Sequence, residues 1–174
     1  AWNGELTTFV GGPQELVEKW RPLLSTWASV ILATGGPVGS AHALKLINNL
    51  ISIGYAALWS ECYAMMGKVG LKPQVLRELI ANTGMNCGNF QNFSKYICDG
   101  DANAHQFSLS NCLKDMTYYS RLASKHNAAT LMSASALELL KLGNNMGFGE
   151  RNIPEAVDIV LRLNGQKEGP ATAS

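Results

Sequence analysis

The sequence predicts a mainly α-helical protein that begins with a short β-α-β segment. Two runs rich in apolar and β-branched residues, 6–10 and 29–34, have the length and composition of strands. After Gly35 and Gly36, the apolar residues recur only at helical spacing. Because 47% of the residues are apolar and only 16% are charged, the chain can bury the core of an ordinary domain and is not a disordered chain.

The first segment is predicted to fold as strand, helix and strand. The strands are expected at Leu6–Val10 and Ser29–Thr34, and a helix is expected between them at Pro13–Trp27, where Pro13 suits a first turn. This order within about 30 residues is typical of the end of an α/β domain. Because a two-stranded sheet cannot stand alone, we expect further strands to come from residues before Ala1 or from another chain.

A long helix is predicted next, from about Ser40, a suitable N-cap, to about Met66, with Gly67 and Gly70 ending it. At 1.5 Å per residue this helix is about 40 Å long, more than a small domain needs. Its uncharged stretch, 46–60, is shorter than the roughly 20 residues of a membrane span and contains two asparagines. We therefore expect a buried helix and no membrane partner.

Shorter helices are predicted over the rest of the chain, separated by Gly- and Asn-rich clusters such as 82–84, 99–101 and 143–145. The expected helices are Pro73–Ala81, Asn89–Cys98, Ser108–Lys125, Leu131–Leu142 and Pro154–Leu163.

Charge and cysteine content exclude several classes of partner. The net charge is +1, with 14 basic and 13 acidic residues, so no basic surface for nucleic acid or acidic lipid is expected. The four cysteines form no CxxC pair, which favours free thiols in a reducing compartment: the cytoplasm, or the mitochondrial matrix in a eukaryote. The three histidines, His42, His105 and His126, lack the spacing of metal ligands, so no metal site is predicted.

The polar residues near the start of the long helix are the first candidates for chemistry. Lys45, Asn48, Asn49 and Ser52 lie at i, i+3, i+4 and i+7 and share one stripe, while apolar residues cover most of the remaining surface. Such a stripe fits the wall of a dry cleft, where a desolvated amine exchanges a proton and an amide orients a hydroxyl or a carboxylate. Spacing alone leaves an alternative open, in which Lys45 extends to solvent and the asparagines bond to neighbouring helices.

The same segment resembles the signature of the β-hydroxyacid dehydrogenase family, which includes 3-hydroxyisobutyrate dehydrogenase and tartronate semialdehyde reductase. The pattern G-x-x-G-x-G-x-x-x-K-x-x-x-N maps onto Gly36, Gly39, Ala41, Lys45 and Asn49, with Ala41 in place of the third glycine. The resemblance implies that Lys45 is the catalytic proton donor and acceptor. It also implies that Asn49, with Asn48 beside it, binds the substrate.

A second motif extends the resemblance along the chain. Phe107, Lys114 and Asp115 are similar to residues that bind NAD or NADP in the family, where the lysine reaches the cofactor. Taken alone, the Lys114–Asp115 pair is more typical of a solvated helix face, and its order after the first motif strengthens the interpretation. The related 6-phosphogluconate dehydrogenases carry a histidine where this chain has Asn48, so a sugar-phosphate substrate is not expected.

The resemblance implies a C-terminal part of such an enzyme. Residues 1–35 are expected to be the truncated end of a Rossmann-type NAD(P)-binding domain, 36–165 an all-helical substrate and dimerisation domain, and 166–174 a flexible tail. The G-x-G-x-x-G and Ser-Gly-Gly segments of the family are missing from this sequence. The isolated chain is therefore expected to be inactive.

The leading hypothesis is an oxidoreductase that transfers a hydride between NAD(P) and a small 3-hydroxy acid or its semialdehyde. The alternative is a non-catalytic helical oligomerisation module derived from the same fold, against which Lys45 argues. In either case the long apolar helix indicates a homodimer or homotetramer.

Overall fold

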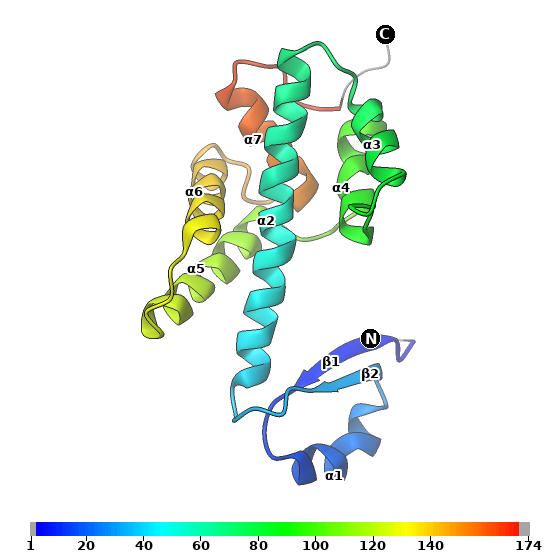
Figure 1. Ribbon diagram of the computed structural model, residues 1–174, viewed down its shortest axis with the longest axis vertical. Helices are drawn as coiled ribbons and strands as arrows, with labels where there is room; N and C mark the ends of the chain where they lie inside the picture. Colours follow the sequence, from blue (N-terminus) through cyan, green and yellow to red (C-terminus); the bar gives the residue numbers. More distant parts are fainter. Residues whose placement is uncertain (1–2, 171–174) are drawn as a thin grey trace. The chain divides into compact units, whose positions relative to one another are not determined.

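The computed structural model describes residues 3–170. They form a two-stranded sheet and a set of α-helices with one short 3₁₀ helix, so the prediction of a mainly α protein is confirmed (Figure 1). In chain order the elements are β1 (Leu6–Val10), α1 (Gln14–Leu24), β2 (Ala28–Ala33), α2 (Ser40–Lys68), α3 (Pro73–Ala81), α4 (Gly88–Asp99), α5 (Leu109–Lys125), α6 (Leu131–Asn145), η1 (Ile153–Glu155) and α7 (Ala156–Leu163).

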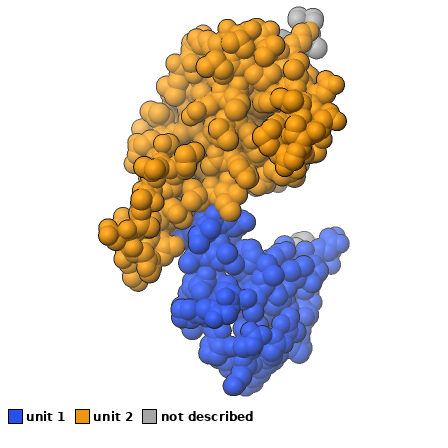
Figure 2. Space-filling model, viewed as in Figure 1, with its two compact units in different colours: residues 1–48 blue, residues 49–174 orange. Residues whose placement is uncertain are grey.

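The chain divides into two compact units, coloured separately in Figure 2. Unit 1 comprises residues 1–48 and unit 2 comprises residues 49–174. The division falls within α2, which is one continuous helix. The predicted domain boundary after residue 35 stays a prediction.

Unit 1 is a β-α-β segment with little core. β1 and β2 pair in parallel, with Thr7 opposite Val30 and Val10 opposite Ala33. Among its described residues only Val17 and Ala28 are buried apolar side chains. Helix α1 ends three residues before the predicted end, because the hydroxyls of Ser25 and Thr26 bond back to the carbonyls of Arg21 and Leu23 and compete with further helix formation.

Unit 2 contains the hydrophobic core. Helices α3 to α7 gather around residues 49–68 of α2, with α3 beside α4 and α5 beside α6 (Figure 1). The core includes Phe93, Leu109, Met116, Leu140 and Ile159, all of which are almost fully buried. In the part of the chain that the structure describes, no helix is long and apolar enough to cross a bilayer.

Two local predictions are wrong. Gly143 and the two asparagines after it do not separate helices but belong to α6, because the missing side chain of Gly143 lets Ile159 of α7 pack directly against this helix. Ser40 lies in the first turn of α2 instead of capping it, and its hydroxyl pairs with that of Thr34. Ser108 does cap α5, since its hydroxyl accepts the backbone N–H of Asn111.

The segment after α7 returns to unit 2. The side chain of Gln166 donates to the carbonyl of Ala64, and the backbone N–H of Gly169 donates to the carboxylate of Asp158. The last part of the predicted tail, 171–174, lies outside the described residues.

Candidate functional site

Helix α2 carries the predicted stripe at the point where its burial begins. Lys45 and Asn48 are exposed, whereas Asn49 is the first buried residue of the helix, with 5% of its surface accessible. Lys45 is not in a dry crevice among the described residues, and its place in one stays a prediction. No residue of α2 before Asn49 is buried.

The structure brings Asn49 together with the second predicted motif. The Nδ2 of Asn49 donates to the Oδ2 of Asp115 on α5 over 2.6 Å, although the two residues are 66 positions apart. The Nζ of Lys114 lies 3.3 Å from the other oxygen of Asp115. Asn49, Lys114 and Asp115 therefore form one cluster at the junction of α2 and α5.

The cluster has one buried end and one open end. The Lys114 side chain is 52% exposed and that of Asp115 is 18% exposed, so the ammonium group is available to a ligand. On the buried side, desolvation and then the charge of Asp115 raise the pKa of the Cys112 thiol. Cys112 therefore stays protonated and is not a nucleophile.

Three of the predicted site residues lie outside this cluster. Phe107 packs against the core of unit 2, just before α5, and its carbonyl accepts the backbone N–H of Ile153. Lys45 and Asn48 lie four residues and one residue before Asn49 on α2, and within residues 3–170 their side chains make no hydrogen bond or ion pair. Lys45 still shares the helix face of Asn49, one turn earlier.

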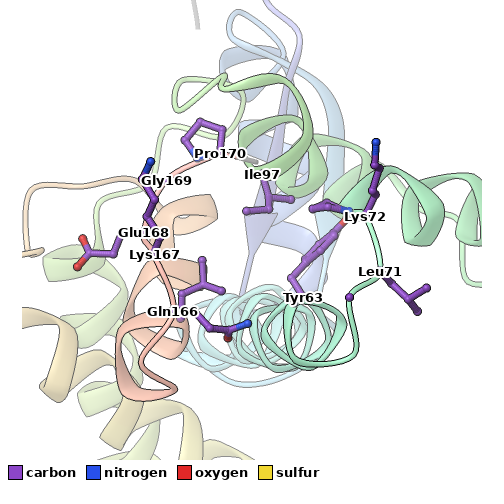
Figure 3. A pocket seen from close by; sticks show the side chains of 13 residues that line it. Tyr63, Leu71, Lys72, Ile97, Gln166, Lys167, Glu168, Gly169 and Pro170 are labelled. Carbon is purple, nitrogen blue, oxygen red and sulfur yellow. The ribbon is translucent and has the colours of Figure 1, made fainter. Parts of the chain in front are cut away.

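A hollow of unit 2 lies away from the predicted site. It is a pocket of about 370 Å³ between the end of α2, the start of α3 and residues 166–170, and Figure 3 labels Tyr63, Lys72 and Gln166 among the residues that line it. The Tyr63 hydroxyl and the Gln166 side-chain oxygen are fully buried without a partner in the described residues. Because both atoms are inaccessible to solvent, they do not offer a ligand contact in this pocket.

A buried carboxylate that the sequence analysis missed lies elsewhere in unit 2. Asp158 is 1% exposed, and its oxygens accept hydrogen bonds from Tyr96 at 2.8 Å, Arg151 at 3.0 Å and the backbone of Gly169 at 2.9 Å. Burial and the carboxylate of Asp158 raise the pKa of Tyr96, which keeps its hydroxyl a donor. A single acid within the apolar run of α7 was the signal that could have revealed this network.

Comparison with known proteins identifies the family of this chain. Residues 39–160, which include Lys45, Asn49, Lys114 and Asp115, match the family model described as the NAD-binding domain of NADP-dependent 3-hydroxyisobutyrate dehydrogenase. The chain belongs to the β-hydroxyacid dehydrogenase family. The predicted family is therefore confirmed, and so is the prediction of NAD or NADP as the cofactor class, since the matching domain is an NAD-binding one.

Two curated relatives are longer than this chain. L-threonate dehydrogenase of Escherichia coli K12 is 24% identical over 169 residues, which cover 96% of this chain and 56% of that enzyme. The 2-(hydroxymethyl)glutarate dehydrogenase of Eubacterium barkeri is 28% identical over 163 residues, which cover 93% of this chain and 54% of that enzyme. This chain thus spans a little more than half of their length.

A solved structure shows the same fold. The 3-hydroxyisobutyrate dehydrogenase of Mycobacterium tuberculosis, determined with L-serine, superposes with a TM-score of 0.81 at 19% identity, over 91% of this chain and 56% of that one. At this identity the likeness concerns the fold, which is that of the C-terminal part of the dehydrogenase.

Proposed function

We propose that this chain is the C-terminal part of an NAD(P)-dependent dehydrogenase or reductase that interconverts a small 3-hydroxy acid and its semialdehyde. The observation that carries the proposal is the hydrogen bond from Asn49 to Asp115, which joins the two motifs of the family in one cluster beside Lys114. The names of the relatives support it, because threonate, 2-(hydroxymethyl)glutarate and 3-hydroxyisobutyrate all carry a hydroxyl and a carboxylate.

Lys45 is the residue proposed to move the proton. In the direction of oxidation its neutral amine accepts the proton of the substrate hydroxyl, and in the direction of reduction its ammonium returns the proton to the carbonyl oxygen. Asn49, one turn further along α2, orients the substrate by hydrogen bonds, and Asn48 is exposed beside it for a further contact.

Lys114, Asp115 and Phe107 are the residues proposed to hold the cofactor. The exposed ammonium of Lys114 is the kind of donor that the phosphate and hydroxyl oxygens of NAD(P) require, so the residues present fit the cofactor. When bound, NAD(P)+ supplies the two-electron acceptor that takes the hydride from the carbinol carbon. Phe107 lies at the N-terminal end of the same helix as Lys114, where it fixes the start of α5 against the core.

The exposure of Lys45 supports the proposal that these residues form only one wall of the cleft. We propose that the other wall is supplied by the part of the protein that corresponds to the N-terminal part of the relatives. The 174-residue chain alone is then inactive, because its lysine faces solvent. Oxidation of a hydroxy acid by this chain alone would contradict that statement.

The test of the proposed function is turnover in the intact protein with Lys45 replaced. Lys45→Ala is expected to lower turnover by about 100- to 10,000-fold, the range for the loss of a general acid–base group, without unfolding the protein. Lys95→Ala, which removes an exposed lysine from α4, is the matched control and keeps turnover unchanged.

Near-normal turnover in Lys45→Ala would refute the catalytic assignment. A direct titration with NAD and NADP separates the proposed enzyme from a non-catalytic oligomerisation module. If the intact protein bound neither cofactor, the module would be the better description.

We also propose that the protein is a homodimer or homotetramer through unit 2. Ile51, Tyr55 and Leu58 of α2 are exposed apolar residues at helical spacing, and Met132 of α6 continues the apolar surface across a shallow groove of about 100 Å³. No charged residue occurs from 46 to 60, although Glu61 lies on the groove beside Leu58. Sedimentation equilibrium at low micromolar concentration measures the assembly, and a stable monomer would contradict it.

Free thiols support a further proposal, that the protein works in a reducing compartment such as the cytoplasm. The four cysteines, Cys62, Cys87, Cys98 and Cys112, are unpaired. Burial raises the pKa of Cys62, Cys98 and Cys112, which keeps these thiols protonated and unreactive. Labelling with a thiol reagent directly after cell lysis measures their state, and a disulfide among them would argue against this compartment.

A further inference from the structure

The hydrogen bond between Asn49 of α2 and Asp115 of α5 joins the two helices and also fixes the orientation of the Asn49 side-chain amide. We infer that Asp115 is a positioning residue, which fixes the side-chain amide of Asn49 so that its oxygen faces the substrate. This inference rests on the function proposed above and deepens it. It assigns Asn49 to the substrate hydroxyl instead of the carboxylate, and it gives Asp115 a second role beside the cofactor contact proposed above.

The first step concerns the direction of the hydrogen bond. An ionised carboxylate only accepts hydrogen bonds, so the group of Asn49 that faces Asp115 must be the NH2 and not the oxygen. The separation of 2.6 Å between Asn49 Nδ2 and Asp115 Oδ2 is that of a short, charge-assisted bond. The bond therefore selects one of the two orientations that an asparagine amide can otherwise adopt.

The second step concerns the atom that remains. The Oδ1 of Asn49 accepts no hydrogen bond from residues 3–170, and it is not among the fully buried atoms without a partner, which are those of Tyr63 and Gln166. The oxygen therefore keeps some accessible surface although the residue as a whole is 5% exposed. An accessible acceptor beside the stripe of Lys45 suits a hydroxyl, which donates, whereas a carboxylate would meet an oxygen of like partial charge.

The third step concerns what else Asp115 touches. Its second oxygen lies 3.3 Å from Lys114, but the lysine side chain is 52% exposed, so water screens this pair. The bond to the buried Asn49 is the shorter and drier of the two. Asp115 therefore lies between the exposed side chain of Lys114 and the amide of Asn49, which it orients.

The test is a double-mutant cycle on the intact protein. Asp115→Asn keeps the shape but lets both amides rotate, and it is expected to lower kcat/KM for hydroxy-acid oxidation by about 10- to 100-fold with the melting temperature little changed. In the Asn49→Ala background the same change is expected to cost less than about threefold, because its target is gone. Glu138→Gln on α6, which removes an exposed carboxylate in the same isosteric way, is the control and leaves kcat/KM unchanged.

An equal loss from Asp115→Asn in both backgrounds would overturn the inference, because Asp115 would then act independently of Asn49. A readout without turnover separates this from failure of the proposed function. In a ¹⁵N-labelled sample, the Asn49 side-chain NH2 signals, assigned by their loss in Asn49→Ala, are expected to lose their downfield shift and slow exchange in Asp115→Asn. Unchanged signals would overturn the positioning role, whatever the enzyme activity. Changed signals in a protein without dehydrogenase activity would retain the fixed amide and refute only its assignment to a substrate hydroxyl.

Discussion

Asp158 and Asn49 are both polar side chains buried in unit 2, and their surroundings differ in one respect. Asp158 accepts three hydrogen bonds, from Tyr96, Arg151 and the backbone of Gly169, which occupy both of its oxygens. Asn49 makes one side-chain bond within the described residues, to Asp115, and its oxygen stays unfilled. We call the network of Asp158 closed, because both of its oxygens accept hydrogen bonds, and that of Asn49 open, because its oxygen accepts none from the described residues.

The difference indicates what each residue does. A closed buried network joins separate segments and leaves nothing for a ligand: Asp158 links α4, the loop before η1 and the C-terminal segment to α7. An open one keeps a hydrogen-bonding group at the edge of the core, and such groups are typical of binding sites.

The largest expected effect on stability is that of removing the closed network. Asp158→Ala leaves the Tyr96 hydroxyl without its acceptor and leaves Arg151 with only the longer ion pairs to Glu155 and Glu168. It is expected to lower the free energy of unfolding by about 3–5 kcal/mol. Asn49→Ala is expected to cost about 1 kcal/mol, because it removes a single hydrogen bond to a carboxylate that is still partly exposed. Urea denaturation of both variants measures the difference, and equal losses would show that the two networks do not differ in kind.

A smaller effect is expected from removing one donor to the closed network. Tyr96→Phe deletes a hydrogen bond to the buried carboxylate of Asp158 and is expected to lower the free energy of unfolding by about 1.5–3 kcal/mol. Tyr63→Phe is the matched control in the same unit, because its hydroxyl is buried without a partner in the described residues. We expect its stability to stay within about 0.5 kcal/mol of the parent. A larger loss for Tyr63→Phe would show that this hydroxyl does have a partner.

Much of the fold could be predicted because the chain carries clear start and stop signals. The bounds of β1 and α3 are those predicted, since glycine, proline or asparagine residues flank both elements. The end of α1 and the continuation of α6 through Gly143 were not predictable in this way. The first depends on side-chain bonds of Ser25 and Thr26, and the second on the approach of Ile159 from another helix, which no local pattern shows.

The candidate site was predictable as two motifs but not as one cluster. Helical spacing placed Lys45 and Asn49 on one stripe, and the family resemblance added Lys114 and Asp115. The bond between Asn49 and Asp115 spans 66 positions and depends on how α5 packs against α2, so periodicity could not reveal it. Spacing left the exposure of Lys45 open, because it does not show where along α2 the buried residues begin, and they begin at Asn49.

The smallest expected effect comes from His105, a half-buried side chain that makes no side-chain hydrogen bond among the described residues. Burial alone lowers the pKa of His105 below its usual 6.5, and no ion pair of the described residues offsets this. As the pH falls through 6.5, the unfolded chain binds a proton that the folded chain does not, so the free energy of unfolding decreases toward acidic pH. His105→Asn is expected to reduce this slope between about pH 7 and 5, whereas His126→Asn, at an exposed position, retains it. Denaturation curves across this range measure both slopes. An unchanged slope in His105→Asn would show that this histidine binds its proton equally well in the folded chain, and that its burial is relieved by a partner as that of Asp158 is.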